Sequence, residues 1–112
     1  MKLVVAVIKP QQLEAVTEAL HGIDVAGITI SEVKGHGQQR GHTEVYRGGE
    51  YNVDYLPKVE LEVLAKDADA EKIASTIVEA ARTGAIGDGK LWIQSVEYAI
   101  RIRTGDVGDD AV

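Results

Sequence analysis

The sequence predicts an α+β protein with the ferredoxin-like order β-α-β, long loop, β-α-β, packed as a sandwich of sheet and helices. Two observations predict this class. Segments in which apolar residues alternate with polar ones are interspersed with segments in which they recur at helical spacing. In addition, an unpatterned stretch from Gly35 to Tyr55 separates two halves with the same order of elements. The 112 residues fit one domain, 1–112, with no linker or low-complexity segment.

The first half predicts a strand, a helix and a second strand. The continuous apolar run from Leu3 to Ile8 is typical of a buried strand. Pro10 suits the start of a helix, and the second strand is predicted over residues 28–33, where apolar and polar residues alternate. The apolar positions of the helix are Leu13, Val16 and Leu20.

The second half repeats this order. Residues 58–64 alternate and predict a half-buried antiparallel strand. A helix follows, capped by Asp67 or Asp69, with Gly84 just beyond its end. Alternation from Leu91 to Arg103 predicts a long last strand, and the acidic tail 106–112 is expected to fray. The inner stripe predicted for the helix is Ile73, Ile77 and Ala81.

The segment 35–55 is too long to be an ordinary connection in a compact domain. It is rich in glycine, which gives the backbone freedom, and in tyrosine, which offers large amphipathic contact area. Large aromatic side chains on such a segment indicate contact with partners more than internal packing. We therefore interpret it as a switch or docking arm. Its tyrosines are Tyr46, Tyr51 and Tyr55.

Composition excludes several classes of protein. The net charge of −6 is not that of a direct nucleic-acid binder. The absence of cysteine rules out disulfides, thiolate catalysis and Cys-based metal sites. No nucleophile and base stand in a recognisable arrangement, which argues against a hydrolase or acyl transferase. The histidines, His21, His36 and His42, form no plausible metal set. With only a short apolar run at its start, we expect a soluble, cytoplasmic protein.

The segment 83–90, TGAIGDGK, is the first candidate for binding chemistry. Its closely spaced glycines allow backbone N–H groups to converge on an anion, and Lys90 adds a positive charge. It is not a Walker motif, because Leu91 replaces the Ser or Thr and the loop runs from helix to strand. Phosphate binding by another geometry and a plain helix end with a tight turn are the two interpretations left open.

Three further cations each have two possible interpretations, one as a ligand-binding residue and one as an ordinary surface charge. Arg101 and Arg103 lie two residues apart on the predicted strand and could grip a phosphate, or they could form a solvated face that pairs with Glu97 or Glu60. Lys58, at the exit of the long loop, could clamp a carboxylate or could be a simple loop-end charge.

Three segments together resemble the PII nitrogen-regulatory signal proteins over essentially the whole chain. They are the long loop with 34–44, KGHGQQRGHTE, and 46–51, YRGGEY; the Gly-rich turn 83–90; and the ending 101–105, RIRTG. The resemblance implies a homotrimer of ferredoxin-like subunits with adenine nucleotide sites in the clefts between subunits. The protein would act as a regulator of nitrogen metabolism rather than as an enzyme.

The resemblance also implies a ligand set. ATP and ADP would compete for one site, and 2-oxoglutarate would join through the Mg²⁺ of bound Mg-ATP. Gln39 would coordinate that Mg²⁺, and Lys58 would pair with the distal carboxylate, with the backbone of Gln39, Arg40 and Gly41 closing over the ligand. The residues implied along the nucleotide are Thr29, Gly37, Gln38, Gln39, Gly87, Asp88, Gly89, Lys90, Arg101 and Arg103.

The long loop would present its tip to partners according to these ligands. Tyr51 would receive a nucleotidyl group, UMP or AMP, and Arg47 would dock on a partner. The implied partners are an ammonium transporter, a glutamine synthetase regulatory enzyme or a nitrogen transcription regulator, with membrane contact only through the transporter.

This sequence departs from the family at several positions. Gln38 stands where the family usually has an arginine that contacts the terminal phosphate, and His36 replaces a usual aromatic residue. These departures leave open a PII-like trimer that senses another small anion or a metal. A slow ATPase is the other alternative, which the resemblance implies because some family members hydrolyse ATP slowly.

Overall fold

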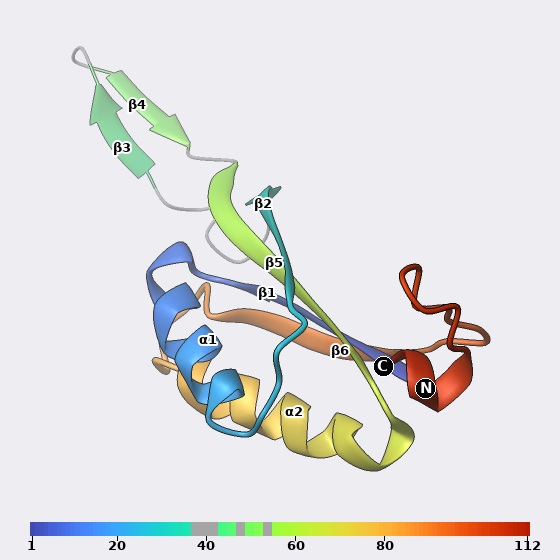
Figure 1. Ribbon diagram of the computed structural model, residues 1–112. Helices are drawn as coiled ribbons and strands as arrows, with labels where there is room; N and C mark the ends of the chain where they lie inside the picture. The colour runs from blue at the N-terminus through green and yellow to red at the C-terminus, as the bar shows by residue number, and fades with distance from the viewer. Residues whose placement is uncertain (37–42, 47–48, 53–54) are drawn as a thin grey trace.

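The computed structural model describes residues 1–36, 43–46, 49–52 and 55–112. A four-stranded antiparallel sheet of order β2-β5-β1-β6 is covered on one face by two helices (Figure 1). This arrangement confirms the predicted α+β, ferredoxin-like fold. The elements are β1 (Lys2–Ile8), η1 (Pro10–Gln12), α1 (Leu13–His21), β2 (Thr29–Gly35), β3 (Thr43–Tyr46), β4 (Gly49–Asn52), β5 (Leu56–Ala65), α2 (Asp67–Ala81), β6 (Gly89–Ser95) and η3 (Gly108–Ala111).

The core lies between the sheet and the two helices. Val4 of β1 is paired with Val63 of β5, and both are buried against the helices. Burying a side chain of this kind stabilises the fold by roughly 1.5–3 kcal/mol. The alternation predicted for β5 and the inner stripe predicted for α2 are confirmed. The buried core positions are Val4, Ala6, Ile8, Val16, Leu20, Val59, Leu61, Val63, Ala65, Ala70, Ile73, Ile77 and Ala81.

The start of α2 differs from the prediction. The helix begins at Asp67 after Lys66, which is its N-cap residue and makes no side-chain cap bond. Asp67 and Asp69 both lie inside the first turn rather than before it. There a carboxylate favours the helix through the positive end of the helix dipole, so these residues still suit the position.

Part of the segment expected to lack regular structure forms a hairpin. β3 and β4 pair antiparallel from Thr43 with Asn52 to Tyr46 with Gly49, as a separate two-stranded sheet. Thr, Val and Tyr favour strands, and only two residues separate the two strands, which is a common hairpin length. The glycines of this segment had indicated irregular backbone, and its strand-forming residues were overlooked in the prediction.

The last strand is much shorter than predicted. β6 ends at Ser95, not at Arg103, because its neighbour β1 begins at Lys2, which pairs with Ser95. Beyond that point the alternating sequence lies beside no strand of the part of the chain that the structure describes. Instead the chain turns back on itself: the N–H of Arg101 donates to the carbonyl of Asp106 (2.9 Å), and Ile100 forms an isolated bridge with Val107.

The C-terminal tail is also ordered, contrary to the expected fraying. The N–H of Gly108 donates to the carbonyl of Ala99 (3.1 Å), and η3 follows directly. Ala111 and Val112 are half-buried in the chain. The tail is therefore held by hydrogen bonds to the segment that follows β6. Of the described residues, none belongs to a helix long and apolar enough to cross a membrane.

Candidate phosphate-binding loop and its two lysines

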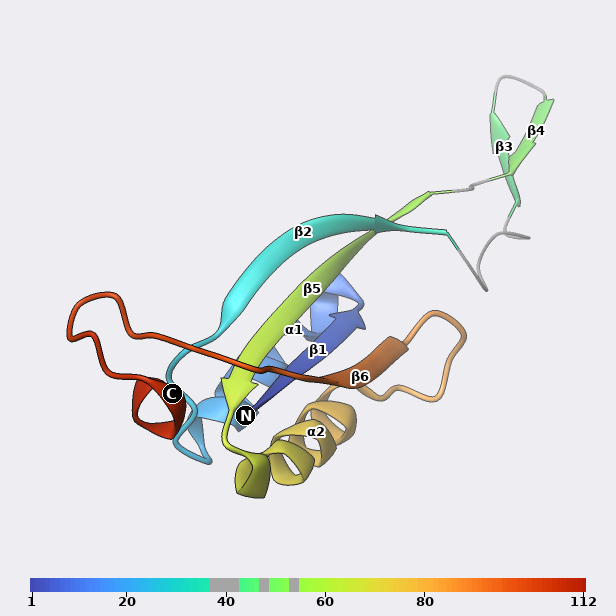
Figure 2. The same cartoon turned by 90° about the vertical axis from the view of Figure 1, so that its right-hand side faces the viewer.

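The loop from Thr83 to Asp88 joins α2 to β6 at one end of the sheet (Figure 2). Gly84, Gly87 and Gly89 have φ of 86°, 97° and 104°, which only glycine adopts without strain. Gly89 also passes so close to β1 that a Cβ would lie 1.7 Å from the carbonyl oxygen of Val7. Gly84 and Gly87 thus set the course of the loop, and Gly89 allows the start of β6 to approach β1.

Asp88 closes this loop from within. Its Oδ2 accepts hydrogen bonds from the N–H groups of Thr83 (2.8 Å) and Gly84 (2.9 Å), and its Oδ1 accepts one from the Thr83 hydroxyl. These hydrogen bonds hold the pKa of Asp88 well below its ordinary value, with the largest contribution from the Thr83 hydroxyl and smaller ones from the backbone N–H groups. The carboxylate of Asp88 therefore faces its own loop.

Lys9 supplies the counter-charge to Asp88. Its Nζ lies 3.2 Å from Asp88 Oδ1 and 3.4 Å from the hydroxyl oxygen of Thr83. Lys9 was not among the predicted site residues. Its position after the buried run of β1 and directly before Pro10 marks the end of a strand but gives no sign of this ion pair.

Lys58 lies beneath the same loop. Its side chain is buried, with the residue 8% exposed, and its Nζ donates to the carbonyl of Gly87 at 2.6 Å. Burial, and then the charge of Lys9, lower the pKa of Lys58, while Asp88 acts in the opposite direction. A Cβ at Gly35 would lie 2.9 Å from the Lys58 Cγ, so the base of the long loop packs directly on this lysine.

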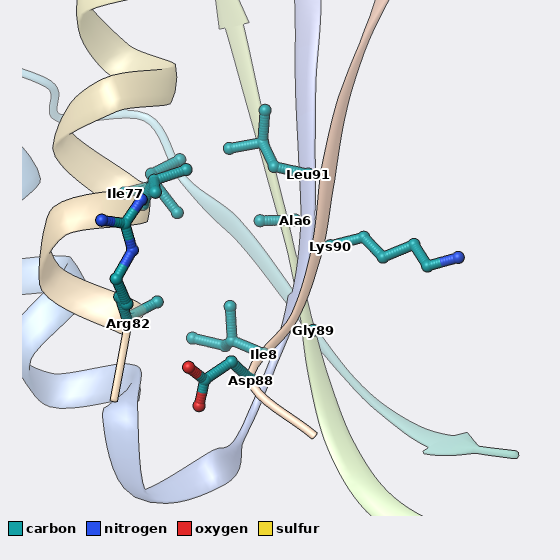
Figure 3. A pocket seen from close by; sticks show the side chains of 10 residues that line it. Ala6, Ile8, Ile77, Arg82, Asp88, Gly89, Lys90 and Leu91 are labelled. Atoms are coloured by element: carbon teal, nitrogen blue, oxygen red, sulfur yellow. The ribbon is translucent and has the colours of Figure 1, made fainter. Parts of the chain in front are cut away.

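Two hollows flank this cluster. One, of about 500 Å³, is lined by Lys58 with Pro10, Pro57 and residues 32–34. The other, of about 170 Å³, lies between α2 and β6, with Ile77 and Leu91 in its wall (Figure 3). The Lys90 side chain points away from this second hollow, whereas Asp88 lies beside Ile8 at its edge. The first hollow therefore adjoins Lys58, and the second is mainly apolar.

The structure brings together only some of the predicted site residues. Gly87, Asp88, Gly89, Lys90 and Lys58 meet at this end of the sheet. Arg101 instead lines a hollow of about 580 Å³ at the other end, beside Val25, Gly27 and Ala65. Arg103 lies in the turn that follows Arg101, and Thr29 pairs with Glu62, toward that same end of β5.

The remaining predicted residues fall on the long loop. Tyr51 lies on β4, paired with Glu44, and its side chain is outside the described parts of the structure. Where the structure does describe side chains, no three His, Asp or Glu residues gather to hold a metal ion. The predicted residues that lie outside the described residues are Gly37, Gln38, Gln39, Arg40, Gly41 and Arg47.

Comparison with known proteins identifies the family. The sequence profile of the family described as "Nitrogen regulatory protein P-II" matches residues 1–106. The chain belongs to the P-II family. Proteins of that name from Rhodospirillum rubrum and Azospirillum brasilense are 54% and 53% identical over 112 residues, covering the whole of both chains in each comparison. The one from Haemophilus influenzae is 53% identical over the same length. A regulatory role in nitrogen metabolism follows from membership of the P-II family.

Proposed function

We propose that this protein is a non-catalytic sensor of ATP, ADP and 2-oxoglutarate that controls nitrogen-metabolism partners through its long loop. The observation that carries the proposal is the Gly-rich loop. Its glycines at 84, 87 and 89 have positive φ, a backbone conformation typical of loops whose N–H groups hold anions, and three cations lie close to it: Lys9, Lys58 and Lys90, the last at the start of β6. Such a site suits the phosphates of a nucleotide.

The nucleotide site would be shared between copies of the chain. In one chain Arg101 and the Gly-rich loop lie at opposite ends of the sheet, so the two phosphate-binding segments cannot meet on one ligand. The arginines of one copy could reach the loop of the next in a closed ring, and a homotrimer is the proposed assembly. Apolar surface that another copy could cover also supports this assembly. The exposed apolar residues include Trp92, Tyr98, Ile100 and Ile102.

Lys58 would anchor the distal carboxylate of 2-oxoglutarate. In the structure its ammonium is bound to the Gly87 carbonyl, a neutral acceptor that a carboxylate would replace with a stronger, charge-assisted bond. Gln39 would hold the Mg²⁺ of Mg-ATP, and Gln39, Arg40 and Gly41 would close over the dicarboxylate. Because Gly35 packs on Lys58, a ligand here would act on the base of the long loop.

Isothermal titration tests the sensor directly. The protein is titrated with 2-oxoglutarate alone and again in the presence of Mg-ATP. Binding that appears only with Mg-ATP supports the proposal; binding without nucleotide, or none with it, overturns it. Lys58→Ala should abolish 2-oxoglutarate binding while ATP binding remains. A multiple-turnover ATPase rate of an ordinary enzyme, roughly 1 s⁻¹ or more, would replace the sensor with an enzyme.

The output would be read at the tip of the loop by an ammonium transporter, a glutamine synthetase regulatory enzyme or a transcription regulator. Arg47 would dock on the partner, and nucleotidylation of Tyr51 would block docking by its bulk and charge. Tyr51→Phe should remove modification by a nucleotidyltransferase and leave ligand binding unchanged. Continued labelling of the variant, measured by intact mass, would place the acceptor elsewhere.

A further inference from the structure

Lys9 joins two parts of the fold that are far apart in sequence. It stands between β1 and η1, whereas its partners Thr83 and Asp88 begin and end the Gly-rich loop. The side chains of Lys9 and Asp88 are only 16% and 22% exposed. Solvent screens such a half-buried pair less than a fully exposed pair, so the contact can still influence the loop.

The carboxylate of Asp88 creates an electrostatic difficulty for an anion site. A negative charge fixed inside a phosphate-binding loop repels the phosphate that the loop would bind. Two features of the structure reduce that repulsion. The donors from Thr83 and Gly84 turn the carboxylate inward, and the ammonium of Lys9 lies 3.2 Å from it. Without Lys9, the loop would keep the negative charge and lose the cation beside it.

The ion pair also limits the conformations open to the loop. Asp88 holds Thr83 and Gly84 at the start of the loop, and Lys9 ties that closed turn to the end of β1. Next to it, Gly89 sits against the Val7 carbonyl and Lys58 against the Gly87 carbonyl. The backbone from Gly87 to Lys90 is therefore fixed from both sides before any ligand arrives, which lowers the cost of ordering it on binding.

We propose that Lys9 is a positioning residue for phosphate binding, which acts by fixing and neutralising Asp88 and does not itself contact the nucleotide. The inference rests on the proposed function, because it assumes that the Gly-rich loop binds phosphate. It also assigns the Asp88 side chain to holding the loop, so only its backbone is left to face the ligand.

The test is a double-mutant cycle with ADP as the probe, measured by isothermal titration on the full chain. Lys9→Ala should weaken ADP binding by about tenfold, the effect of losing a charge-assisted contact. Lys9→Arg should restore most of the affinity, since it keeps the charge beside Asp88. Lys2→Ala removes a lysine at the end of β1 that lies away from Lys9 and should leave the affinity within about twofold.

The Asp88→Asn variant shows whether Lys9 acts on phosphate binding through Asp88 or by contacting the phosphate itself. If Lys9 acts through Asp88, adding Lys9→Ala to Asp88→Asn should change ADP affinity by less than about twofold. A full tenfold further loss would show that Lys9 touches the phosphate, which overturns the inference. Wild-type affinity in Lys9→Ala would overturn it as well. Circular dichroism melts show which variants fold; if Lys9→Ala does not, Lys9→Gln takes its place in the cycle.

Failure of the proposed function gives a different result. In that case the wild-type chain itself does not bind ADP, and both the sensor and the role of Lys9 are rejected together. Wild-type binding of ADP with an unchanged Lys9→Ala variant rejects only the role of Lys9 and leaves the sensor in place.

Discussion

The two ends of the sheet differ in how completely one chain builds them. At the end with the Gly-rich loop, buried or half-buried charges contact one another and the backbone, as in Lys9 with Asp88 and Lys58 with Gly87. At the other end the segment after β6 exposes large apolar side chains, and Ile102 is 97% exposed. One end is thus organised within the chain, and the other presents apolar surface of the kind that marks a contact with another molecule.

The largest effect is expected from Gly89→Ala, which breaks the organised end. The new Cβ would lie 1.7 Å from the Val7 carbonyl oxygen, and φ of 104° is unfavourable for alanine. Strand β6 would have to move away from β1 where they begin to pair. We expect the free energy of unfolding to fall by roughly 3 kcal/mol or more, measured by urea denaturation.

Gly84→Ala is the matched control for that variant. Gly84 also has a positive φ, 86°, but no atom lies within 4 Å of the position of its Cβ. Only the backbone strain remains, so the cost should be about 1 kcal/mol. Equal losses for the two variants would mean that strain, and not the close approach to β1, controls this end of the sheet.

An intermediate effect is expected from Asp88→Asn, and it should depend on pH. The pKa of Asp88 in the fold is below its ordinary value of 3.8, so its ionised form stabilises the fold. That contribution is fully present above the ordinary value and is lost as the pH falls below roughly 4 toward the lowered pKa. Asp88→Asn should therefore lower the thermal midpoint at about pH 7, with a gap to wild type that narrows at about pH 3. A gap that is constant with pH would show that the charge of Asp88 does not stabilise the loop.

The sequence predicted the strands and helices in which the spacing of apolar residues matches the face that is buried in the core. In β5 the alternation of Val59, Leu61 and Val63 with glutamates corresponds to one face on the core, and the helix stripes were equally visible. The length of β6 could not be found this way. Alternation continues to Arg103, but a strand also needs a partner, and β1 begins opposite Ser95. Pairing is a property of two segments, so one segment alone does not reveal it.

The site was predicted in the same partial way. Glycines and Lys90 in one short run indicated the loop, because its chemistry is local in sequence. Lys9 was missed because its partner is Asp88, 79 positions away, and nothing near Lys9 indicates an ion pair. The distance between Arg101 and the loop was equally hidden, since only the folded sheet shows that they lie at opposite ends.

A small gain in stability is expected from Lys58→Met. Burial lowers the pKa of Lys58 from 10.5. At neutral pH the lysine is charged, so the fold bears the full cost of burying that charge. This cost disappears as the pH rises through the lowered pKa toward 10.5. Methionine has a similar unbranched side chain, shorter by the terminal nitrogen, and carries no charge. The thermal midpoint should rise by about 1–3 °C, measured by circular dichroism. A lower midpoint would mean that the bond to the Gly87 carbonyl outweighs the burial cost.

The smallest effect on the fold of the chain is expected from Ile102→Lys, at the incomplete end. The side chain is almost fully exposed, so its replacement removes no contact within the chain, and the circular dichroism spectrum should match that of wild type. If this end meets another copy, a charge here would be placed in an apolar contact, and the mass measured by light scattering should fall. Ala15→Lys is the control, because Ala15 is also exposed but lies on α1, away from both ends that the proposed assembly joins. A wild-type mass for Ile102→Lys would exclude Ile102 from the contact between copies, and a reduced mass for both variants would mean that the added charge, and not its position, breaks up the assembly.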